Sequence, residues 1–350
     1  MTRLPVAILG ATGTVGQKFV RLLAAHPWFE PTVLAASAQS AGKPYGEVVR
    51  WREPSPLPEA LAGLTVRRAD EPLDATLVFS ALDAAAAASV EEQHARAGAL
   101  VVTNASPWRM DPAIPLIVPE VNGDHLGMLD AQRRTRGWKG GIVANPNCST
   151  AALVLALAPL HRAFAVQRVF VSTMQAVSGA GYPGVASLDA LGNVIPYIGQ
   201  EEEKIERETR KILGDWLDDG VALAPITVSA HTNRVPVVDG HMETVSVGFA
   251  RRVTPGEARA ALESFRADGI VATLPSTPAR PVEVDDRPDR PQPRLDLDRG
   301  GGMTVTVGRL RGCPLLDVRL VVLGHNTIRG AAGAAIQNAE LLVAQGVVRR

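Results

Sequence analysis

The stretch Val6-Ala-Ile-Leu-Gly10-Ala-Thr-Gly13-Thr-Val-Gly16, close to the N-terminus, decides the fold. Its apolar run predicts a buried strand, and the glycines that follow predict a tight turn into a helix. Glycine lets the backbone approach a pyrophosphate, and the start of a helix offers unpaired N–H groups. The spacing is G-x-x-G-x-x-G and not the commoner G-x-G-x-x-G, so the spacing alone is a weak signal. The prediction of a dinucleotide site rests on the position of the glycines between a strand and a helix. The alternative is a plain turn whose glycines serve packing alone.

The rest of the first half alternates short β-branched runs with alanine-rich stretches, which is typical of a parallel sheet covered by helices. The expected strands and helices are strands 6–9, 32–36, 77–80, 100–103 and 141–144, and helices 16–25, 84–97 and 151–161. The apolar run of the helix at 151–161 is interrupted by Pro159 and His161, so we expect a core helix and not a membrane span.

The second half has longer strands between polar and glycine-rich stretches, which predicts a mixed or antiparallel sheet. The expected strands are 166–175, 244–250, 303–310 and 315–323. Residues 275–294, rich in Pro, Arg and Asp, are expected to form an exposed loop or to wrap over a neighbouring surface. The small-residue helix at 326–343 could return to the first domain.

These patterns predict an α/β protein of two domains. A Rossmann-type parallel-sheet domain would span residues 1–147 and be completed by the C-terminal helix 326–350, and an α+β domain with a mixed sheet would span 148–325.

The composition excludes several classes of protein. The 350 residues contain 36 Lys and Arg against 36 Asp and Glu, so no overall charge recruits nucleic acid or an anionic membrane. Only two cysteines are present, which fits a reducing cytoplasm and excludes a disulfide framework. The N-terminus lacks the long apolar region of a signal peptide, and no metal-ligand spacing is visible. We therefore expect a soluble cytoplasmic protein without a metal.

The segment after the second strand indicates which dinucleotide binds. An NAD site usually places Asp or Glu there, to hold the ribose 2′-hydroxyl. This chain has Ala36-Ser-Ala-Gln-Ser-Ala-Gly-Lys43, without an acid. Ser37, Ser40 and Lys43 could bind a 2′-phosphate, so NADP is the predicted cofactor.

Cys148 lies where a predicted strand enters a helix, in Asn145-Pro-Asn-Cys-Ser-Thr150. A helix N-terminus stabilises a thiolate, which predicts a nucleophilic cysteine. Asn147 could offer its amide to a developing oxyanion. The alternative is a buried structural cysteine.

The chain resembles the aspartate-semialdehyde dehydrogenases over nearly its whole length, and looks closest to their archaeal and fungal branch. Four motifs carry the resemblance: Asn145-Pro-Asn-Cys-Ser-Thr150, Gln175-Ala-Val-Ser-Gly-Ala-Gly-Tyr-Pro-Gly184, Glu201-Glu-Glu-Lys204 and Asn233-Arg-Val-Pro-Val-Val-Asp-Gly-His241. The resemblance implies that the second domain is a catalytic and dimerisation domain, and that the protein is a homo-oligomer, at least a dimer.

The resemblance also implies roles for single residues. Cys148 would be the nucleophile, His241 the general acid/base, and Gln175 would orient the substrate. The substrate-binding residues would be Asn147, Arg234 for the carboxylate, Glu201 for the ammonium group, and Lys204 and Arg109 for the phosphate. The cofactor-binding residues would be Gly10, Thr12, Gly13, Thr14, Val15, Gly16, Ser37, Ser40, Ser178, Gly179 and Asn326.

Two of these assignments are less direct. The run Glu201-Glu202-Glu203 leaves open which acid meets the ammonium group, and a solvated helix start is the alternative for the whole segment. Pro107-Trp108 precedes Arg109 where the family usually has serine and leucine. His125, His231 and His325 have no support from the resemblance.

The implied reaction is the reversible NADP-dependent reductive dephosphorylation of L-aspartyl-4-phosphate to L-aspartate 4-semialdehyde through a Cys148 thioester. It belongs to lysine, diaminopimelate, threonine and methionine biosynthesis. The nearest alternative is an acyl-CoA reductase of the malonyl-CoA type on the same scaffold, although coenzyme A offers no ammonium group to Glu201. A dinucleotide-sensing regulator without catalysis would lack the nucleophile or the acid/base, and both are present.

Overall fold

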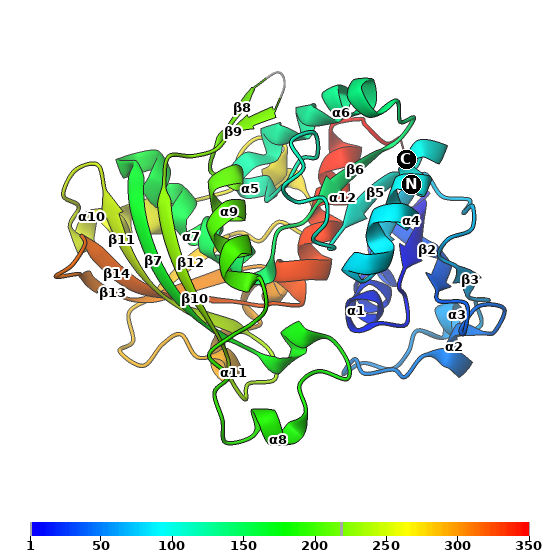
Figure 1. The fold of residues 1–350 in the computed structure, drawn as a ribbon, viewed down its shortest axis with the longest axis horizontal. Coiled ribbons are helices and arrows are strands. Elements are labelled where there is room, and N and C mark those ends of the chain that lie inside the picture. Colours follow the sequence, from blue (N-terminus) through cyan, green and yellow to red (C-terminus); the bar gives the residue numbers. More distant parts are fainter. Residues whose placement is uncertain (1, 218–219, 350) are drawn as a thin grey trace.

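The computed structural model describes residues 2–217 and 220–349. Its N-terminal part is built on a sheet in which all neighbouring strands run parallel, in the order β3-β2-β1-β4-β5-β6 (Figure 1). The strands are β1 (Leu4–Leu9), β2 (Phe29–Ala36), β3 (Arg67–Arg68), β4 (Leu77–Ser80), β5 (Leu100–Thr103) and β6 (Gly141–Ala144). This strand order is that of a Rossmann-type sheet, as predicted.

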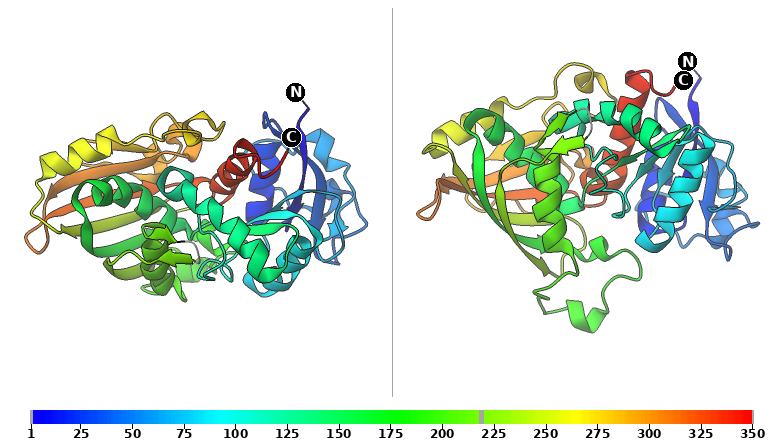
Figure 2. Two further views of the ribbon diagram at one scale, coloured as in Figure 1. Left: turned by 90° about the horizontal axis from the view of Figure 1, so that it is seen from above. Right: turned by 45° about the horizontal axis from the view of Figure 1, so that its top comes forward.

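Helices cover both faces of this sheet, because the side chains that point to either face along each strand are apolar. Val6 and Ile8 pack in one core with α1 and α12, whereas Ala7 and Leu9 pack in the other. The helices of this part are α1 (Thr14–Leu23), α2 (Tyr45–Val48), α3 (Glu59–Ala62), α4 (Ala84–Ala97), α5 (Pro119–Asn122), α6 (Met128–Arg136) and, from the C-terminal end, α12 (Gly333–Ala344). Figure 2 shows α12, in red, beside the N-terminal sheet.

The second sheet is mixed and has the order β10-β7-β11-β14-β13-β12. Its outer pairs β10–β7 and β12–β13 are parallel, and the pairs between them are antiparallel. The strands are β7 (Val166–Gln175), β10 (Thr227–Arg234), β11 (His241–Phe249), β12 (Val282–Asp285), β13 (Val305–Gly312) and β14 (Val318–Gly324); β8 (Asp215–Leu217) and β9 (Gly220–Ala222) form a separate hairpin. The prediction of a mixed sheet is confirmed.

Two helices pack against one face of the mixed sheet, α7 (Cys148–Phe164) and α10 (Pro255–Ser264). The remaining helices are α8 (Ser187–Ala190), α9 (Glu201–Ile212), which contacts β10 and α7, and α11 (Pro293–Asp296). The opposite face of the sheet is partly exposed, as shown by Phe170 on β7, which is 44% exposed. Because that face lacks a helical layer, it is available to another surface.

The structure moves the bounds of several expected elements by a few residues, and three differences are larger. The helix expected at 151–161 begins at Cys148 itself and continues through Pro159 to Phe164. The helix expected at 326–343 is a π-turn (Ile328–Ala332) followed by α12. Strand β10 was not expected, because its polar outward residues hide the alternation of an edge strand.

The segment 275–294 is not simply an exposed loop. It contributes β12 to the mixed sheet, where Val282 is buried, and short helix α11 follows. Asp285 and Asp296 are buried and form ion pairs with Arg299 at 2.5 and 2.7 Å. The segment is therefore an exposed loop only in part, at residues 286–289, and a sheet strand at Val282–Asp285, where charged residues that neutralise one another can be buried.

Candidate active site

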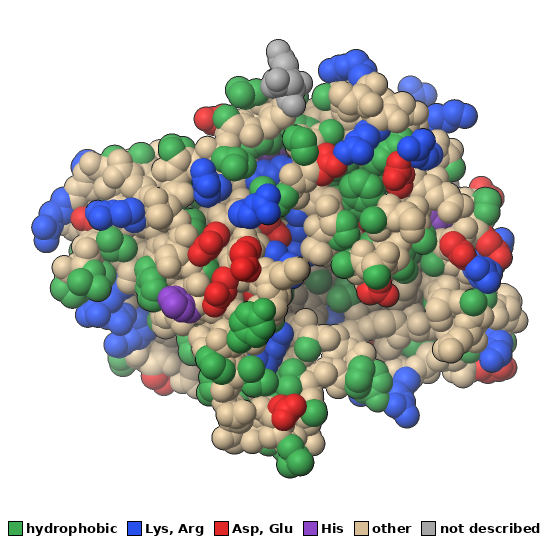
Figure 3. Space-filling view, viewed as in Figure 1, with side chains coloured by type: hydrophobic (Ala, Val, Ile, Leu, Met, Phe, Trp, Pro, Cys, Tyr) green, Lys and Arg blue, Asp and Glu red, His purple; other side chains and the backbone are tan. Residues whose placement is uncertain are grey.

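A cavity of about 890 Å³ lies between the two parts of the molecule, and Figure 3 shows it as a hollow near the centre of one face. It follows the carboxyl ends of the parallel strands, where Rossmann-type sheets bind ligands. Gly10 follows β1, Ser37 follows β2, Ala81 follows β4 and Asn104 follows β5, and all four line the cavity.

The glycine turn after β1 and the start of α1 line the cavity. Gly10 has φ +71°, and a Cβ there would lie 2.5 Å from the carbonyl oxygen of Ala81. Gly16 does not line the cavity, but a Cβ there would lie 2.1 Å from the Gly10 oxygen, so its glycine serves packing. The N-terminus of α1 has no side-chain cap and no acid in its first turn, and the Thr14 hydroxyl is buried without a partner in the described structure. These residues fit the pyrophosphate of a dinucleotide.

The residues expected to select NADP are only partly brought to this cavity. Ser37 lines it, whereas Ser40 and Lys43 do not. Ser37 lies directly after β2, while Ser40 lies on the turn that its own N–H closes by donating to the Ser37 carbonyl at 3.0 Å. Of these three residues, Ser37 alone lines the cavity.

We expect Ser37→Asp to weaken NADP binding more than NAD binding, because the new carboxylate opposes only the 2′-phosphate. The loss for NADP should be about tenfold or more, the scale of one unfavourable charge contact. Fluorescence titration with both cofactors measures it. Ser55→Asp, which adds the same charge in a loop away from the cavity, is the control. Equal losses for NADP and NAD would contradict the assignment.

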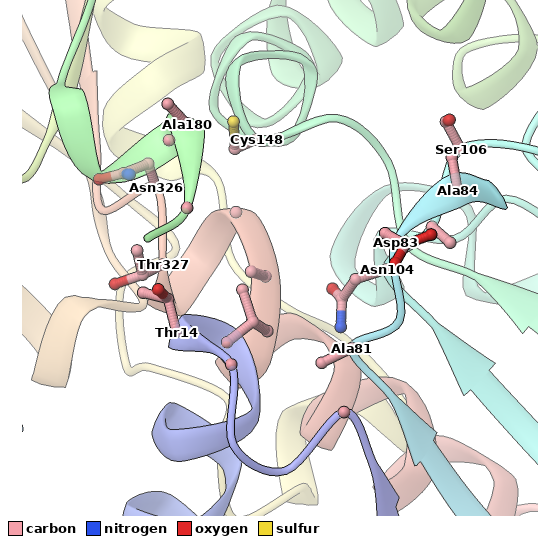
Figure 4. Close-up of a pocket in the computed structure, with 18 of the residues that line it drawn as sticks. Thr14, Ala81, Asp83, Ala84, Asn104, Ser106, Cys148, Ala180, Asn326 and Thr327 are labelled. Carbon is pink, nitrogen blue, oxygen red and sulfur yellow. The ribbon is translucent and has the colours of Figure 1, made fainter. Parts of the chain in front are cut away.

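Cys148 is the first residue of α7, and its sulfur faces the cavity (Figure 4). Asn147 caps this helix, since its side-chain oxygen accepts the N–H groups of Ser149 and Thr150 at 3.0 and 3.3 Å. Gly330, in the π-turn, lies so close that a Cβ there would be 2.6 Å from the Cys148 Cβ. Cys148 is thus held between its own helix cap and the C-terminal segment.

The N–H of Ser149 at the helix start lowers the pKa of Cys148, in the predicted direction, but larger effects raise it. Burial, and second the charge of Glu201, raise the pKa of Cys148 to about 12, although Arg109 and Arg234 oppose the shift. One N–H of the Asn147 amide is also taken, because Nδ2 donates to Glu201 Oε2 at 2.7 Å. The thiol is therefore protonated at neutral pH.

His241 is fully buried, beneath the cavity wall formed by Gly179. Its Nδ1 accepts the N–H of Ala176 at 3.1 Å, which places the ring proton on Nε2. That Nε2 has no partner among the described residues. A Cβ on Gly179 would lie 3.0 Å from Nε2, so only glycine leaves the ring this close to the cavity. Burial, and then Arg234, lower the pKa of His241 to about 3, and the imidazole is neutral at pH 7.

Arg234 and Gln175 are paired in register at the ends of β10 and β7. Arg234 lines the cavity, and its Nη1 donates to the Ala176 carbonyl at 2.7 Å. Gln175 is buried and does not line the cavity; its Nε2 lies 3.4 Å from the Thr173 hydroxyl. The structure therefore brings Arg234 to the site and leaves Gln175 behind it.

The start of α9 contributes one carboxylate and one positively charged side chain to the cavity. Of the three consecutive glutamates, only Glu201 lines the cavity; Glu202 accepts the N–H of Thr232 at 2.9 Å, and Glu203 is exposed. Lys204 also lines the cavity, with Nζ 2.9 Å from Glu201 Oε1. The segment is thus more than a solvated helix start.

Two buried residues of α9, Glu208 and Lys211, were not predicted as site residues, although both bind Arg109, which was predicted. Arg109 lines the cavity, and its Nη1 donates to Glu208 Oε1 at 3.1 Å. Lys211 donates to the Arg109 carbonyl at 2.9 Å. Their spacing from Glu201, seven and ten residues, places them on the same face of the helix and is the signal that could have revealed them.

Asn326 also lines the cavity, and it links the segment after β7 to the residue that precedes β11. Its Nδ2 donates to the Ser178 hydroxyl at 2.8 Å, and its Oδ1 accepts the N–H of Gly240 at 2.8 Å. The predicted site residues that line the cavity are Gly10, Thr12, Gly13, Thr14, Val15, Ser37, Arg109, Asn147, Cys148, Ser178, Gly179, Glu201, Lys204, Arg234 and Asn326. Gly16, Ser40, Gln175 and His241 do not line it.

Residues 2–217 and 220–349 contain no group of three or more His, Cys, Asp or Glu that could hold a metal ion. No helix in these ranges is long and apolar enough to cross a membrane.

A Rossmann-type sheet and a helix-start cysteine that line one cavity define a class of two-domain dehydrogenases. Residues 5–129 match the family model described as semialdehyde dehydrogenase, NAD binding domain, and residues 157–329 match semialdehyde dehydrogenase, dimerisation domain.

Individual relatives narrow the class. The chain is 49% identical to the aspartate-semialdehyde dehydrogenase of Archaeoglobus fulgidus, over 99% of this chain and 100% of the relative. It is 48% identical to that of Cryptococcus neoformans, over 99% of both. The crystal structure of aspartate semialdehyde dehydrogenase with NADP from Candida albicans is similar with a TM-score of 0.91 and 40% identity, covering 99% of this chain and 100% of that one. The chain belongs to the aspartate-semialdehyde dehydrogenase family, as its motifs predicted.

Proposed function

We propose that this chain catalyses the reversible NADP-dependent reduction of L-aspartyl-4-phosphate to L-aspartate 4-semialdehyde, with release of phosphate. One observation carries the proposal: a single cavity brings Cys148 together with one carboxylate, that of Glu201, and with three positively charged side chains. These side chains are Arg109, Lys204 and Arg234. An aspartyl phosphate has matching groups, since it carries an ammonium group, a carboxylate and a phosphate around one acyl carbon.

The charged groups divide between the two ends of the substrate. Glu201 would accept the ammonium group and Arg234 would hold the carboxylate through its planar fork. Arg109 and Lys204 would hold the phosphate. These assignments follow the family resemblance, and the positions on the cavity wall support them.

The covalent step needs no other base, because the departing phosphate takes the thiol proton. The Cys148 sulfur bonds to the acyl carbon, the bond from that carbon to the phosphate oxygen breaks, and the thiol proton leaves with the phosphate as hydrogen phosphate. A thiol whose pKa is about 12 loses its proton more readily once a dianionic acceptor is held beside it by Arg109 and Lys204. The product is a Cys148 thioester, which splits one hard substitution into two easier steps.

NADPH, when bound, supplies the hydride that reduces the thioester carbon. The glycine turn after β1, with Thr14 and Ser37, would hold it along the carboxyl edge of the sheet. His241 would then donate a hydrogen bond from Nε2 to the oxygen that develops negative charge. Its tautomer supports this role, because Nδ1 is occupied by the Ala176 N–H. One proton is taken up as the adduct collapses to aldehyde and free thiol.

The test of the proposed function is NADP reduction with L-aspartate semialdehyde as a function of phosphate concentration. We expect saturation with phosphate and no reduction without it. Malonyl-CoA with NADPH is the comparison for the acyl-CoA alternative, and turnover with malonyl-CoA alone would overturn the proposal. The relatives' names favour the aspartate substrate, and no comparison favours the coenzyme A thioester.

Arg234→Lys should reduce kcat/KM for the aldehyde by roughly 2–4 kcal/mol of transition-state binding, because an ammonium group cannot form the two parallel bonds of a guanidinium. Steady-state kinetics with aldehyde and phosphate varied separately measure it. The phosphate KM should stay unchanged and serves as the internal control. A rise in phosphate KM without loss of aldehyde affinity would assign Arg234 to the phosphate.

The match to a dimerisation domain over 157–329 indicates an oligomer. We infer a homodimer at least, for which the exposed face of the mixed sheet is the available surface. We also place the enzyme in the cytoplasm, in lysine, diaminopimelate, threonine and methionine biosynthesis. The proposed domain boundary remains 147/148, with the C-terminal segment 326–350 assigned to the cofactor domain; the packing of α12 against the N-terminal sheet supports this division.

A further inference from the structure

We propose that Glu208 is a positioning residue that holds Arg109 and the start of the nucleophile's helix in one fixed arrangement. The proposal rests on the proposed function, because it takes Arg109 to bind the substrate phosphate. Glu208 lies on α9, is 1% exposed and does not line the cavity. It can therefore act only through the residues that it touches.

The two carboxylate oxygens of Glu208 serve two different partners. Oε1 accepts Nη1 of Arg109 at 3.1 Å, and Oε2 accepts the backbone N–H of Asn147 at 2.6 Å. Since both oxygens accept, the ionised carboxylate fits these contacts. Burial raises the pKa of Glu208, and the Arg109 charge opposes the shift. One acid thus joins the phosphate-binding arginine to the residue before Cys148.

The same helix also fixes the backbone that carries Arg109. The buried Lys211 Nζ donates to the carbonyls of Arg109, Asp111 and Ile114 at 2.9, 2.8 and 2.8 Å. Arg109 Nη2 donates to the Asn104 carbonyl at 2.6 Å, and its Nε is buried without a partner in the described structure. Glu208 and the Asn104 carbonyl thus hold the guanidinium at both terminal nitrogens, while Lys211 holds the backbone of Arg109.

The contact to Asn147 extends this control to the other end of the substrate. Asn147 caps α7 through Oδ1 and donates to Glu201 through Nδ2 at 2.7 Å. Glu208 therefore fixes the residue that lies between the thiol and the acid proposed for the ammonium group. A structural role alone explains this less well, because burying a charge costs more than the pair usually returns.

Glu208→Gln tests the inference. A glutamine offers one acceptor and one NH₂ group, so it can keep the contact to Arg109 or to Asn147, but not both. We expect the phosphate KM to rise by about tenfold or more, the effect of a lost charge-assisted bond, while the KM for NADP stays within about threefold. Glu206→Gln is the matched control, since Glu206 is on the same helix and accepts the Ala230 N–H at 3.1 Å.

The outcomes separate this inference from the proposed function. If the parent enzyme does not saturate with phosphate, the proposed function fails and the inference fails with it. If the parent saturates and folded Glu208→Gln matches Glu206→Gln, the inference alone is overturned.

A second measurement covers a variant that does not fold. Glu208→Asp keeps the charge but is one methylene too short to reach both partners, and should also raise the phosphate KM; a parental value would overturn the inference. In an Arg109→Gln background, Glu208→Asp should add no further rise, whereas an additive rise would show that it does not act through Arg109.

Discussion

Cys148→Ser is expected to bind NADP as the parent does and to lose turnover by about three orders of magnitude or more, the scale for loss of a covalent nucleophile. Burial already holds the pKa of the Cys148 thiol at about 12. A serine hydroxyl in the same place would be much harder to ionise. Steady-state rates and cofactor titration measure both parts. Cys313→Ser is the control and should stay active; the reverse pattern would make Cys313 the nucleophile.

The raised pKa gives this prediction a pH signature. Below a pKa of about 12 the thiolate fraction grows about tenfold for each pH unit, because the thiol is the dominant form throughout. Alkylation of the free enzyme by iodoacetamide, in the Cys313→Ser background, should therefore accelerate from pH 7 to pH 10 without a plateau. A plateau below pH 9 would mean that the surroundings stabilise the thiolate after all.

His241→Ala should lower kcat by about 10²–10⁴, the usual contribution of a placed proton donor or acceptor. The tautomer makes a sharper distinction possible. If Nε2 acts as a donor toward the oxyanion, His241→Gln, whose amide N–H can reach the same place, should recover at least about tenfold over His241→Ala. NADP affinity should be unchanged in both variants.

Equal losses in the two His241 variants would contradict the donor role. That result would instead support a base that removes the thiol proton, because an amide cannot accept a proton. The buried environment argues against such a base, since it lowers the pKa of His241 to about 3.

Local patterns made the fold and the place of Cys148 at the start of a helix predictable. The turn from Gly10 to Gly16 and the cysteine at the start of α7 depend on residues that are neighbours in sequence, so their conformations follow from strand, turn and cap preferences. The alternating strands and helices of the first half give the parallel sheet for the same reason.

Properties that depend on tertiary packing could not be read in this way. The pKa of Cys148 is set first by burial and second by Glu201, which lies more than fifty positions away in the chain. The pairing of Glu208 with Arg109 joins residues separated by 99 positions. Likewise, the sequence offers both Ser37 and Ser40 for the cofactor, and of the two only Ser37 lines the cavity in the folded chain.

The contact of Gly330 with Cys148 has a consequence for folding. The cavity joins a turn at Gly10 to a segment that ends at Ala331, so its wall brings together residues that are far apart in the chain. Pairings so distant along the chain form slowly, because closing long loops costs entropy before the contacts reward it. The thiol therefore reaches its buried setting late in folding, and is open to oxidation before then.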